Sequence, residues 1–444
     1  MAFPDAITED SVKAGKLSSR QIALNFTDLH PPLDEHQAAV EAARCYFCYD
    51  APCIAACPTE IDIPLFIRQI ASGSPETAAI TILESNILGG LCARVCPTES
   101  LCEEKCVRQV AEEKPVEIGL LQRFATDRIM ARSSHPFQRQ PATGRSVAVV
   151  GAGPAGLACA HRLAMKGHDV SVFERRTKSG GVNEYGIAAY KVVDSFAERE
   201  IEWLLGIGGI AIHTNAPVES YKDVLRLRED FDAVFLGLGL GAFNSLMVEG
   251  LQLRNVEYAV DFIERVRQAE ELTDIAVGND VVVIGGGMTA IDAAVQSKLI
   301  GADNVTILYR GDRSRMKASR YEQQLAAHKG VKIVANAQAA AFRGNGRVEE
   351  IKVTRSAVAG RDGLVAERLP ADQVFLAIGQ QLVEPPLKLR TERGKIAVDS
   401  FGRTSLEGVW AGGDCVAPGD DLSVTAVAQG RDAAEDIHAS FGES

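Results

Sequence analysis

The stretch RSVAVVGAGPAGLACAHRLAMKGHDVSVFERR (145–176) decides the fold, because it predicts a strand, a glycine turn, an amphipathic helix and a second strand in succession. Gly151 permits the tight turn, Gly153 permits close approach of the backbone to a pyrophosphate, and Gly156 permits close packing of the helix. The pyrophosphate is expected at the helix N-terminus, where unpaired N–H groups and the helix dipole favour an anion. Glu174 ends the second strand and can accept hydrogen bonds from a ribose diol. The stretch therefore predicts a dinucleotide-binding βαβ unit.

A second unit of the same kind follows in NDVVVIGGGMTAIDAAVQSKLIGADNVTILYR (279–310). It keeps Gly285 and Gly287 and has Ala290 at the third glycine position, which this turn tolerates. Two copies of one supersecondary unit predict two nucleotide-binding domains in one chain.

The two units differ at the end of their second strands. Counting from the first glycine puts Leu308 at the position equivalent to Glu174, followed by Tyr309 and Arg310. The second unit thus offers no carboxylate to a ribose 2′-hydroxyl but does offer a cation. The first site therefore suits FAD, and the second suits a nicotinamide dinucleotide.

A third stretch supports FAD in the first site. GVWAGGDCVAP (408–418) predicts a strand followed by Gly413 and Asp414, and a helix begins near Ser423. In flavoproteins with two dinucleotide domains such an aspartate holds the ribityl chain of the flavin, and the helix N-terminus faces the pyrimidine end of the ring. The FAD domain is therefore expected to be split around the nicotinamide domain.

Eight of the ten cysteines lie between Cys45 and Cys106. CYFCYDAPCIAACP (45–58) has the spacing C-x2-C-x4-C-x3-C-P, and CARVCPTESLCEEKC (92–106) has C-x3-C-P-x4-C-x3-C. Zinc sites usually pair two short knuckles that are separated by a dozen or more residues, whereas ferredoxin-type segments crowd their cysteines and follow one with proline. The spacing favours two 4Fe-4S clusters, with eight thiols for eight ligands, over zinc or disulfides.

The predicted fold class is α plus α/β, an α-helical domain with two 4Fe-4S clusters followed by two Rossmann-like dinucleotide-binding domains of the two-dinucleotide flavoprotein type. The expected domains are an iron–sulfur domain at 1–143, a split FAD domain at 144–245 and 375–444, and an NAD(P)H domain at 246–374. The net charge of -12 argues against a nucleic-acid surface. No apolar run approaches the length of a membrane span, and the N-terminus lacks the features of a secretion signal, so a cytoplasmic protein is expected.

With these marks the chain resembles the flavin–iron–sulfur subunit of bacterial NAD-dependent dihydropyrimidine dehydrogenase and, more distantly, the small subunit of glutamate synthase. The resemblance covers nearly the whole chain from about Asp34 onward, through RCYFCYDAPC, LCARVCPTESLCEEKC, IGLLQRFATD, GAGPAGLA, IGGGMTAIDAA and WAGGDCV. It implies one cluster on Cys45, Cys48, Cys53 and Cys106, and another on Cys57, Cys96, Cys102 and the amide oxygen of Gln122.

By this resemblance Cys92 is not a ligand. Glutamate synthase-like members tend to have glutamate where Gln122 stands, so the glutamine favours the pyrimidine-reducing branch. Lys191 falls where the eukaryotic enzyme has an arginine near the flavin ring. Met288 stands where relatives often have Asn or Asp, and no consequence is assigned to this change.

NADH is expected in preference to NADPH. NADPH-using relatives have two adjacent basic residues after the strand, whereas Arg310 is followed by Gly311 here. Arg313, Arg315 and Lys317 can partly replace the missing cation. Hydride transfer depends on stacking geometry more than on proton donors, so no catalytic residue is nominated, and Gly379 is a candidate for close approach to nicotinamide or flavin.

The resemblance implies an electron-entry subunit that oxidises NADH at FAD and passes electrons through two 4Fe-4S clusters to a partner. The partner is expected to be an FMN- and iron–sulfur-containing catalytic subunit that reduces uracil or thymine. Alternatives are the glutamate synthase small subunit, an NAD(P)H:ferredoxin-type oxidoreductase, and a zinc-bearing scaffold without enzymatic activity. The residues expected to contact FAD or the nicotinamide dinucleotide are Gly151, Ala152, Gly153, Pro154, Ala155, Gly156, Glu174, Arg175, Gly181, Val182, Lys191, Val218, Gly413, Asp414, Ser423, Val424, Thr425, Gly285, Gly286, Gly287, Met288, Thr289, Arg310, Lys317, Ala377, Ile378 and Gly379.

Overall fold

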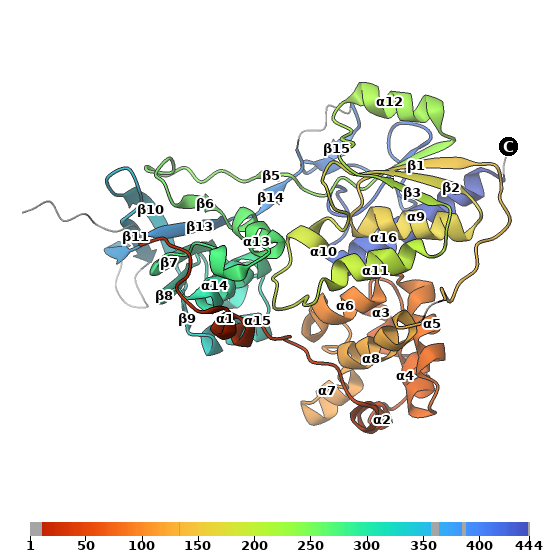
Figure 1. The fold of residues 1–444 in the computed structure, drawn as a ribbon, viewed down its shortest axis with the longest axis horizontal. Helices are drawn as coiled ribbons and strands as arrows, with labels where there is room; N and C mark the ends of the chain where they lie inside the picture. Colours follow the sequence, from red (N-terminus) through yellow and green to blue (C-terminus); the bar gives the residue numbers. More distant parts are fainter. Residues whose placement is uncertain (1–10, 133, 357–363, 384–387, 443–444) are drawn as a thin grey trace, which may run out of the picture. The chain divides into compact units, whose positions relative to one another are not determined.

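The computed structural model describes residues 11–132, 134–356, 364–383 and 388–442 (Figure 1). The chain divides into two compact units. Unit 1 comprises Met1–Asp28, Tyr185–Tyr190 and Phe243–Gly379, and unit 2 comprises Leu29–Glu184, Lys191–Ala242 and Gln380–Ser444. The predicted fold class is confirmed, because a helical region is followed by two parallel sheets with helices on them.

The first part of unit 2 is a helical region. Its helices are α2 (Glu35–Ala43), α3 (Pro52–Ala55), α4 (Ile63–Ala71), α5 (Pro75–Ser85), α6 (Gly89–Val95), α7 (Val107–Glu112) and α8 (Ile118–Met130), with a 3-10 turn at Thr98–Ser100. α2 begins where the Asp34 carboxylate accepts the Gln37 N–H. Phe66, Ile82 and Leu121 are completely buried in the shared core of α4, α5 and α8.

The second part of unit 2 is a five-stranded parallel sheet with strand order β17-β4-β1-β2-β3. Its strands are β1 (Ser146–Val150), β2 (Asp169–Phe173), β3 (Ile210–His213), β4 (Ala233–Leu236) and β17 (Val409–Ala411), and its helices are α9 (Pro154–Met165), α10 (Val182–Tyr185), α11 (Phe196–Leu205), α12 (Tyr221–Asp230) and α16 (Ser423–Ser440). α9 and α16 lie side by side along the sheet (Figure 1). The sheet and the helical region share one hydrophobic core, to which Leu157, Ile201 and Val427 contribute.

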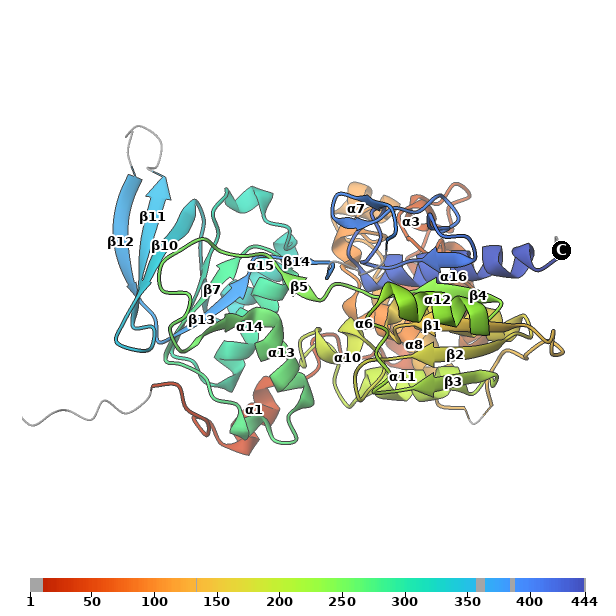
Figure 2. The ribbon, with the colours of Figure 1, turned by 90° about the horizontal axis from the view of Figure 1, so that it is seen from above.

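Unit 1 has its own five-stranded parallel sheet, with strand order β6-β13-β7-β8-β9, and a three-stranded antiparallel sheet, β10-β11-β12 (Figure 2). Its elements are α1 (Ser19–Asn25), β6 (Val256–Tyr258), α13 (Ala259–Gln268), β7 (Asp280–Gly285), α14 (Met288–Ile300), β8 (Asn304–Leu308), α15 (Arg320–His328), β9 (Val331–Val334), β10 (Ala337–Arg343), β11 (Glu350–Ser356), β12 (Leu364–Pro370) and β13 (Gln373–Ala377), with 3-10 turns at Leu272–Asp274 and Arg313–Arg315. Outside these sheets, β5 (Ala242–Phe243) pairs with β14 (Gln380–Gln381), and in unit 2 β15 (Thr391–Glu392) pairs with β16 (Lys395–Ile396).

The compact units differ in two respects from the ranges expected for the domains. The iron–sulfur domain was expected over 1–143, but the described residues up to Asp28 pack with unit 1, where the Asn25 amide donates to the Leu299 carbonyl at 2.8 Å. The inserted segment of unit 1 is Phe243–Gly379 instead of 246–374. The assignment of a cofactor to each range stays a prediction.

Among the residues that the structure describes, no single helix is long and apolar enough to cross a membrane. α5 and α6 reach the required length and composition only as a pair, and the pair is bent by 89°.

Candidate functional site

The first glycine turn connects β1 to α9 in unit 2. Gly151 has a φ of 98°, and a Cβ there would lie 2.3 Å from the Gly237 carbonyl oxygen. A Cβ on Gly156 would lie only 1.9 Å from the Gly151 carbonyl oxygen, so the close packing expected at this position is present. Gly153 is the N-cap of α9, and Gly181 comes so close that its Cβ would lie 2.8 Å from the Gly153 Cα. The turn leaves the N-terminus of α9 bordered by backbone rather than side chains.

Glu174 lies buried beside this turn, at the end of β2. One of its carboxylate oxygens accepts the Ala152 N–H and the other accepts the Arg176 N–H, each at 2.8 Å. Both bonds hold the carboxylate at the tip of the second strand, where a βαβ unit places the ribose of a bound dinucleotide.

The C-terminal segment joins the same site within unit 2. The Gly413 N–H donates to the Gln429 side chain at 2.7 Å, and the Ser423 hydroxyl at the start of α16 donates to Asn183 at 2.8 Å. Burial raises the pKa of Asp414 to about 6, and the charge of Asp421 acts in the same direction. The chain thus brings the glycine turn, the β2 tip and the α16 N-terminus into one unit.

The other residues predicted to contact FAD also lie in unit 2. Arg175 follows Glu174, and its guanidinium lies beside Gly241. Lys191 is buried, and Val218 packs against the core under β1 and β4. The remaining members belong to the α9 start, α10 and the α16 start, namely Pro154, Ala155, Val182, Val424 and Thr425.

The second glycine turn connects β7 to α14 in unit 1. Gly285 has a φ of 153°, and a Cβ there would lie 2.2 Å from the Ala377 carbonyl oxygen, so Ala377 and its neighbours Ile378 and Gly379 lie at this turn. Gly287 is the N-cap of α14. Met288 and Thr289 form the first turn of α14, so the predicted nicotinamide-site residues of both segments come together.

The equivalence assumed between Leu308 and Glu174 is wrong by one residue. Val150 pairs with Phe173 in the first sheet, and Ile284 pairs with Leu308 in the second. Tyr309 therefore corresponds to Glu174. The reason is that α14 has 13 residues whereas α9 has 12, which delays the second strand by one position. The conclusion that no carboxylate stands there is unchanged.

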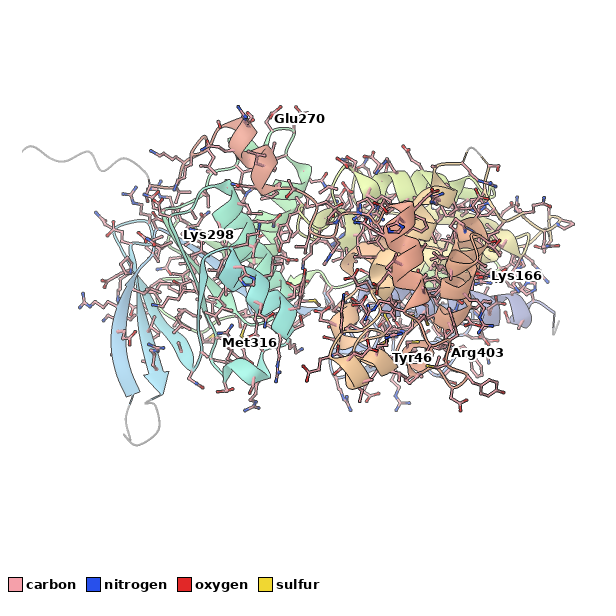
Figure 3. All side chains as sticks on the ribbon, turned by 90° about the horizontal axis from the view of Figure 1, so that it is seen from below. Tyr46, Lys166, Glu270, Lys298, Met316 and Arg403 are labelled. Atoms are coloured by element: carbon pink, nitrogen blue, oxygen red, sulfur yellow. The ribbon has the colours of Figure 1, made fainter. Side chains whose placement is uncertain are left out.

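The Tyr309 ring lies against the glycine turn. A Cβ on Gly286 would lie 2.4 Å from the ring, and the phenol donates to the Arg315 carbonyl at 2.8 Å. Arg310 is exposed, and Arg313 donates from Nε to the Gln323 side chain at 2.9 Å. Lys317 is also exposed, while its neighbour Met316 is buried in the same loop of unit 1 (Figure 3).

The cysteines Cys45, Cys48, Cys53 and Cys106 come together in unit 2 and are partly exposed. Burial, together with the charges of the other three thiols, raises the pKa of Cys53 to about 12. Tyr46 follows Cys45, and the Arg108 guanidinium lies 4.1 Å from its ring centroid. The first predicted set of four ligands is therefore a spatial cluster.

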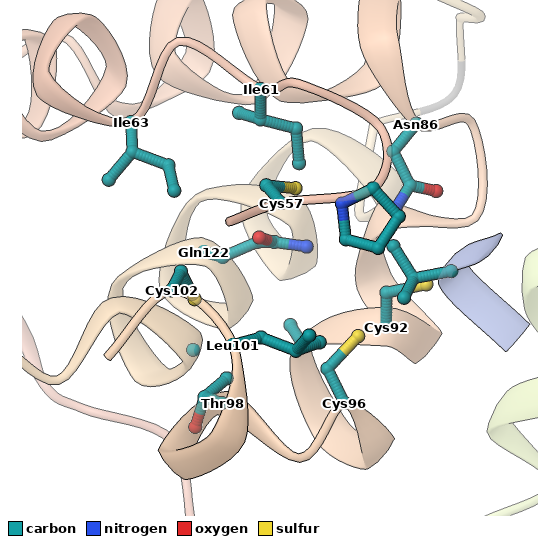
Figure 4. A pocket seen from close by; sticks show the side chains of 14 residues that line it. Cys57, Ile61, Ile63, Asn86, Cys92, Cys96, Thr98, Leu101, Cys102 and Gln122 are labelled. Carbon is teal, nitrogen blue, oxygen red and sulfur yellow. The ribbon is translucent and has the colours of Figure 1, made fainter. Parts of the chain in front are cut away.

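A second group of donors lines a buried pocket (Figure 4). Its members are Cys57, Cys92, Cys96, Cys102 and Gln122. A hydrogen bond between the Cys92 and Cys96 thiols, together with burial and the neighbouring thiols, raises the pKa of Cys96 well above its usual value. Cys92 is 1% exposed. The structure thus brings both candidates for the eighth ligand, Cys92 and Gln122, to one pocket.

Gln122 is oriented by its amide nitrogen. The side chain is 8% exposed, and Nε2 donates to the Gly89 carbonyl oxygen at 2.7 Å. Its Oε1 oxygen makes no hydrogen bond to any residue that the structure describes, and it lies between Cys57 and Cys102 in Figure 4. An amide held in this way presents an oxygen to the pocket.

The donors fit a cluster better than a single ion. Within the described ranges, no three His, Cys, Asp or Glu side chains converge as a single metal ion requires. Each ligand of a 4Fe-4S cluster binds a different iron, so its donors surround a cavity instead of meeting at one point. Asn86 adds a buried amide nitrogen without a hydrogen-bond partner to the same lining. Thiols and two amides in an otherwise apolar lining fit a sulfur-rich group.

Helix α6, which carries Cys92 and precedes Cys96, is held by Glu200 of α11. The carboxylate is 1% exposed and accepts the Leu91 N–H at 2.9 Å. A Cβ on Gly90 would lie 2.7 Å from the Glu200 oxygen and 2.8 Å from the Phe196 ring, so a larger residue would displace these side chains. Burial raises the pKa of Glu200 to about 8, against the opposing hydrogen bonds of the helix N–H groups.

The sequence reasoning did not find Asn86, Glu200 or Arg431. Arg431 of α16 donates to the Thr59 and Ser85 carbonyl oxygens at 2.8 and 2.9 Å, which fixes α16 against the helical region. Val424, also on α16, lines the cysteine pocket. In the sequence Asn86 directly follows Glu84 and Ser85, so its own pattern does not mark it as a buried residue.

Comparison with known proteins defines the class. The pyridine nucleotide-disulphide oxidoreductase family matches residues 145–430, and the dihydropyrimidine dehydrogenase domain II, 4Fe-4S cluster family matches residues 22–134. FprA from Mycobacterium tuberculosis has the same fold with a TM-score of 0.56 and 19% identity, over 68% of this chain and 85% of that one. The thioredoxin reductase of T. acidophilum has a TM-score of 0.52 and 21% identity, over 68% of this chain and 100% of that one. The chain is a pyridine nucleotide oxidoreductase with an N-terminal 4Fe-4S domain.

Full-length relatives specify the family. The chain is 35% identical to the NAD-dependent dihydropyrimidine dehydrogenase subunit PreT of Salmonella typhimurium, over 93% of this chain and 97% of that protein. It is 36% identical to the PreT subunit of Escherichia coli over the same shares. The glutamate synthase [NADPH] small chain of Escherichia coli is 33% identical over 93% of each chain. The chain belongs to the family of NAD-dependent dihydropyrimidine dehydrogenase subunits.

Proposed function

We propose that this chain is the electron-entry subunit of a dihydropyrimidine dehydrogenase. It oxidises NADH at FAD and delivers electrons through two 4Fe-4S clusters to an FMN- and iron–sulfur-containing partner subunit, which reduces uracil or thymine to the 5,6-dihydro form. Flavin accepts a hydride and gives up single electrons, which is the conversion that a chain of one-electron clusters requires.

The observation that carries this proposal is that the N-terminus of α16 borders both the candidate flavin site and the cysteine pocket. Its first turn contains Ser423, which bonds to Asn183 beside the candidate flavin site, and Val424, which lines the cysteine pocket. One helix end therefore borders both candidate cofactor sites within unit 2. This supports direct transfer between a flavin and the cluster in that pocket.

The proposed ligand sets are those that the family resemblance implies. The partly exposed set would hold one cluster, and the buried set with the Gln122 oxygen would hold the other, while Glu174 and the first glycine turn would hold the FAD ribose and pyrophosphate. NADH would bind at the second glycine turn, in unit 1. The proposed domains are 1–143 for the clusters, 144–245 with 375–444 for FAD, and 246–374 for NADH.

The test is reconstitution with the partner. The purified chain alone is expected to reduce artificial electron acceptors with NADH but not uracil, because a pyrimidine site is expected on the partner subunit. Addition of an FMN-containing dihydropyrimidine dehydrogenase subunit should create NADH-dependent uracil reduction, measured as loss of uracil absorbance. Activity with a glutamine-hydrolysing large subunit instead would assign the chain to glutamate synthase, the alternative that the 33% identical relatives keep open.

NADH is the proposed substrate because the segment that follows β8 lacks two adjacent basic residues. Arg310 is followed by Gly311, and Arg313 already bonds to Gln323. One missing charge-assisted contact to the 2′-phosphate lowers the affinity for NADPH about tenfold. The value of kcat/KM with an artificial acceptor should therefore be about tenfold higher for NADH than for NADPH. A higher value for NADPH would contradict this part of the proposal and leave the rest intact.

A further inference from the structure

Asn86 lies between α5 and α6 with its amide in a fixed orientation. The side chain is 0% exposed, and its Oδ1 oxygen accepts the Leu88 N–H at 3.1 Å. A flipped amide would set its NH2 group against that N–H donor, so the hydrogen bond determines which atom is nitrogen. Among the residues that the structure describes, Nδ2 has no hydrogen-bond partner.

An unpaired donor in this position is costly. Native proteins rarely leave a buried polar group without a hydrogen-bond partner, because burial removes the water that would otherwise pair with it. Asn86 lines the pocket of Cys57, Cys96, Cys102 and Gln122, and Figure 4 shows its nitrogen on the pocket side. A neutral amide nitrogen has no lone pair suited to iron, but it has two hydrogens to donate.

We propose that the Asn86 Nδ2 group donates a hydrogen bond to a sulfur of the cluster in this pocket, either a bridging sulfide or a cysteine thiolate, and raises the reduction potential of that cluster. The inference rests on the proposed function, which places a 4Fe-4S cluster there. Hydrogen bonds to cluster sulfurs tune the potential, because the electron gained on reduction makes the sulfurs better acceptors. One electron enters, no proton is transferred, and the N–H bond stays intact.

The position of Asn86 indicates which electron transfer a raised potential would favour. Val424 of α16 lines the same pocket, so this cluster is the one bordered by the helix that begins at the candidate flavin site. A raised potential favours acceptance of an electron from the flavin. The partly exposed set around Cys48 and Cys53 does not share Asn86 and provides an internal reference.

The experiment is a potentiometric titration of Asn86→Leu followed by electron paramagnetic resonance. Loss of the donor should shift the oxidised-to-reduced ratio of one cluster about tenfold towards oxidised at a given potential, which is about 59 mV for a one-electron couple. The other cluster should not shift. Asn86→Asp keeps the Oδ1 acceptor for Leu88 but replaces the amide donor with a carboxylate. The same direction is expected, because the lost donor and the added negative charge both lower the potential. Flavin absorbance and circular dichroism verify folding.

An unchanged potential in a folded variant with both clusters would overturn the proposal. Should both variants lose the cluster, wild-type protein with 15N-labelled asparagine decides, since a nitrogen coupling to the reduced cluster is expected and its absence would overturn the proposal equally. Wild-type protein with no cluster bound to Cys57, Cys96 and Cys102 would refute the proposed function itself, an outcome distinct from an unshifted potential.

Discussion

Replacing Gln122 by alanine should remove or alter one of two 4Fe-4S clusters, whereas replacing Cys92 by alanine should leave both in place. Nε2 of Gln122 donates to the Gly89 carbonyl, and its oxygen faces the pocket with no hydrogen-bond partner in the part of the chain that the structure describes. Alanine would leave one iron of the proposed cluster without its protein ligand. Iron and sulfide content should fall from about eight to about four of each per chain, or one resonance signal should change. Chemical analysis and electron paramagnetic resonance of the purified variant measure this.

Cys92→Ala is the matched control, because it removes a buried thiol from the same pocket. Gln122→Glu should rescue the cluster, since a carboxylate oxygen can replace the amide oxygen at iron. The reverse pattern, with a cluster lost in Cys92→Ala and both retained in Gln122→Ala, would assign the eight cysteines to the eight ligand positions and reject the set implied by the family.

Gly430→Ala should prevent stable binding of FAD. Gly430 lies where α16 crosses the first turn of α9, and a Cβ there would lie 2.0 Å from the Ala155 carbonyl oxygen and 2.9 Å from its carbon. These are backbone atoms of the turn that would hold the pyrophosphate, so relief of the clash must move either the helix or the turn. Overpacking against backbone costs about 3 kcal/mol or more. Thermal unfolding and flavin absorbance of the purified variant measure both effects.

Gly442→Ala is the matched control for this prediction. Gly442 follows α16, and a Cβ there would meet its nearest atom, the Ala439 carbonyl oxygen, at 3.6 Å, an ordinary contact. This variant should bind flavin and unfold like the wild type. Equal melting temperatures and flavin contents of the two variants would show that α9 and α16 can separate without loss of the site.

The architecture could be predicted from the sequence because its signals are local. A strand, a glycine turn and a helix lie next to one another in the chain, and the packing role of Gly156 follows from that geometry. The correspondence between the two units failed by one residue at Leu308, because spacing does not show where a helix gains a residue. Only strand pairing reveals that Tyr309 is the position equivalent to Glu174.

The surroundings of the cysteine pocket could not be predicted in the same way. Asn86 and Glu200 belong to no spaced pattern, and they reach α6 from elements before it and far after it in the chain. Their significance depends on burial and on the direction of single hydrogen bonds. Such properties arise from tertiary packing, which a reading of neighbouring residues does not contain.

Helix α16 borders both the candidate flavin site and the cysteine pocket, which limits how this protein can be divided into fragments. The helical region matches a family of its own, yet its core includes Leu157, Ile201 and Val427, and its cysteine pocket is closed in part by Val424. A fragment cut at residue 143 would leave these apolar contacts open to water. A fusion of the helical region to another flavoprotein therefore needs an equivalent of α16 in that flavoprotein. The smallest part of the chain that keeps these contacts is the whole of unit 2.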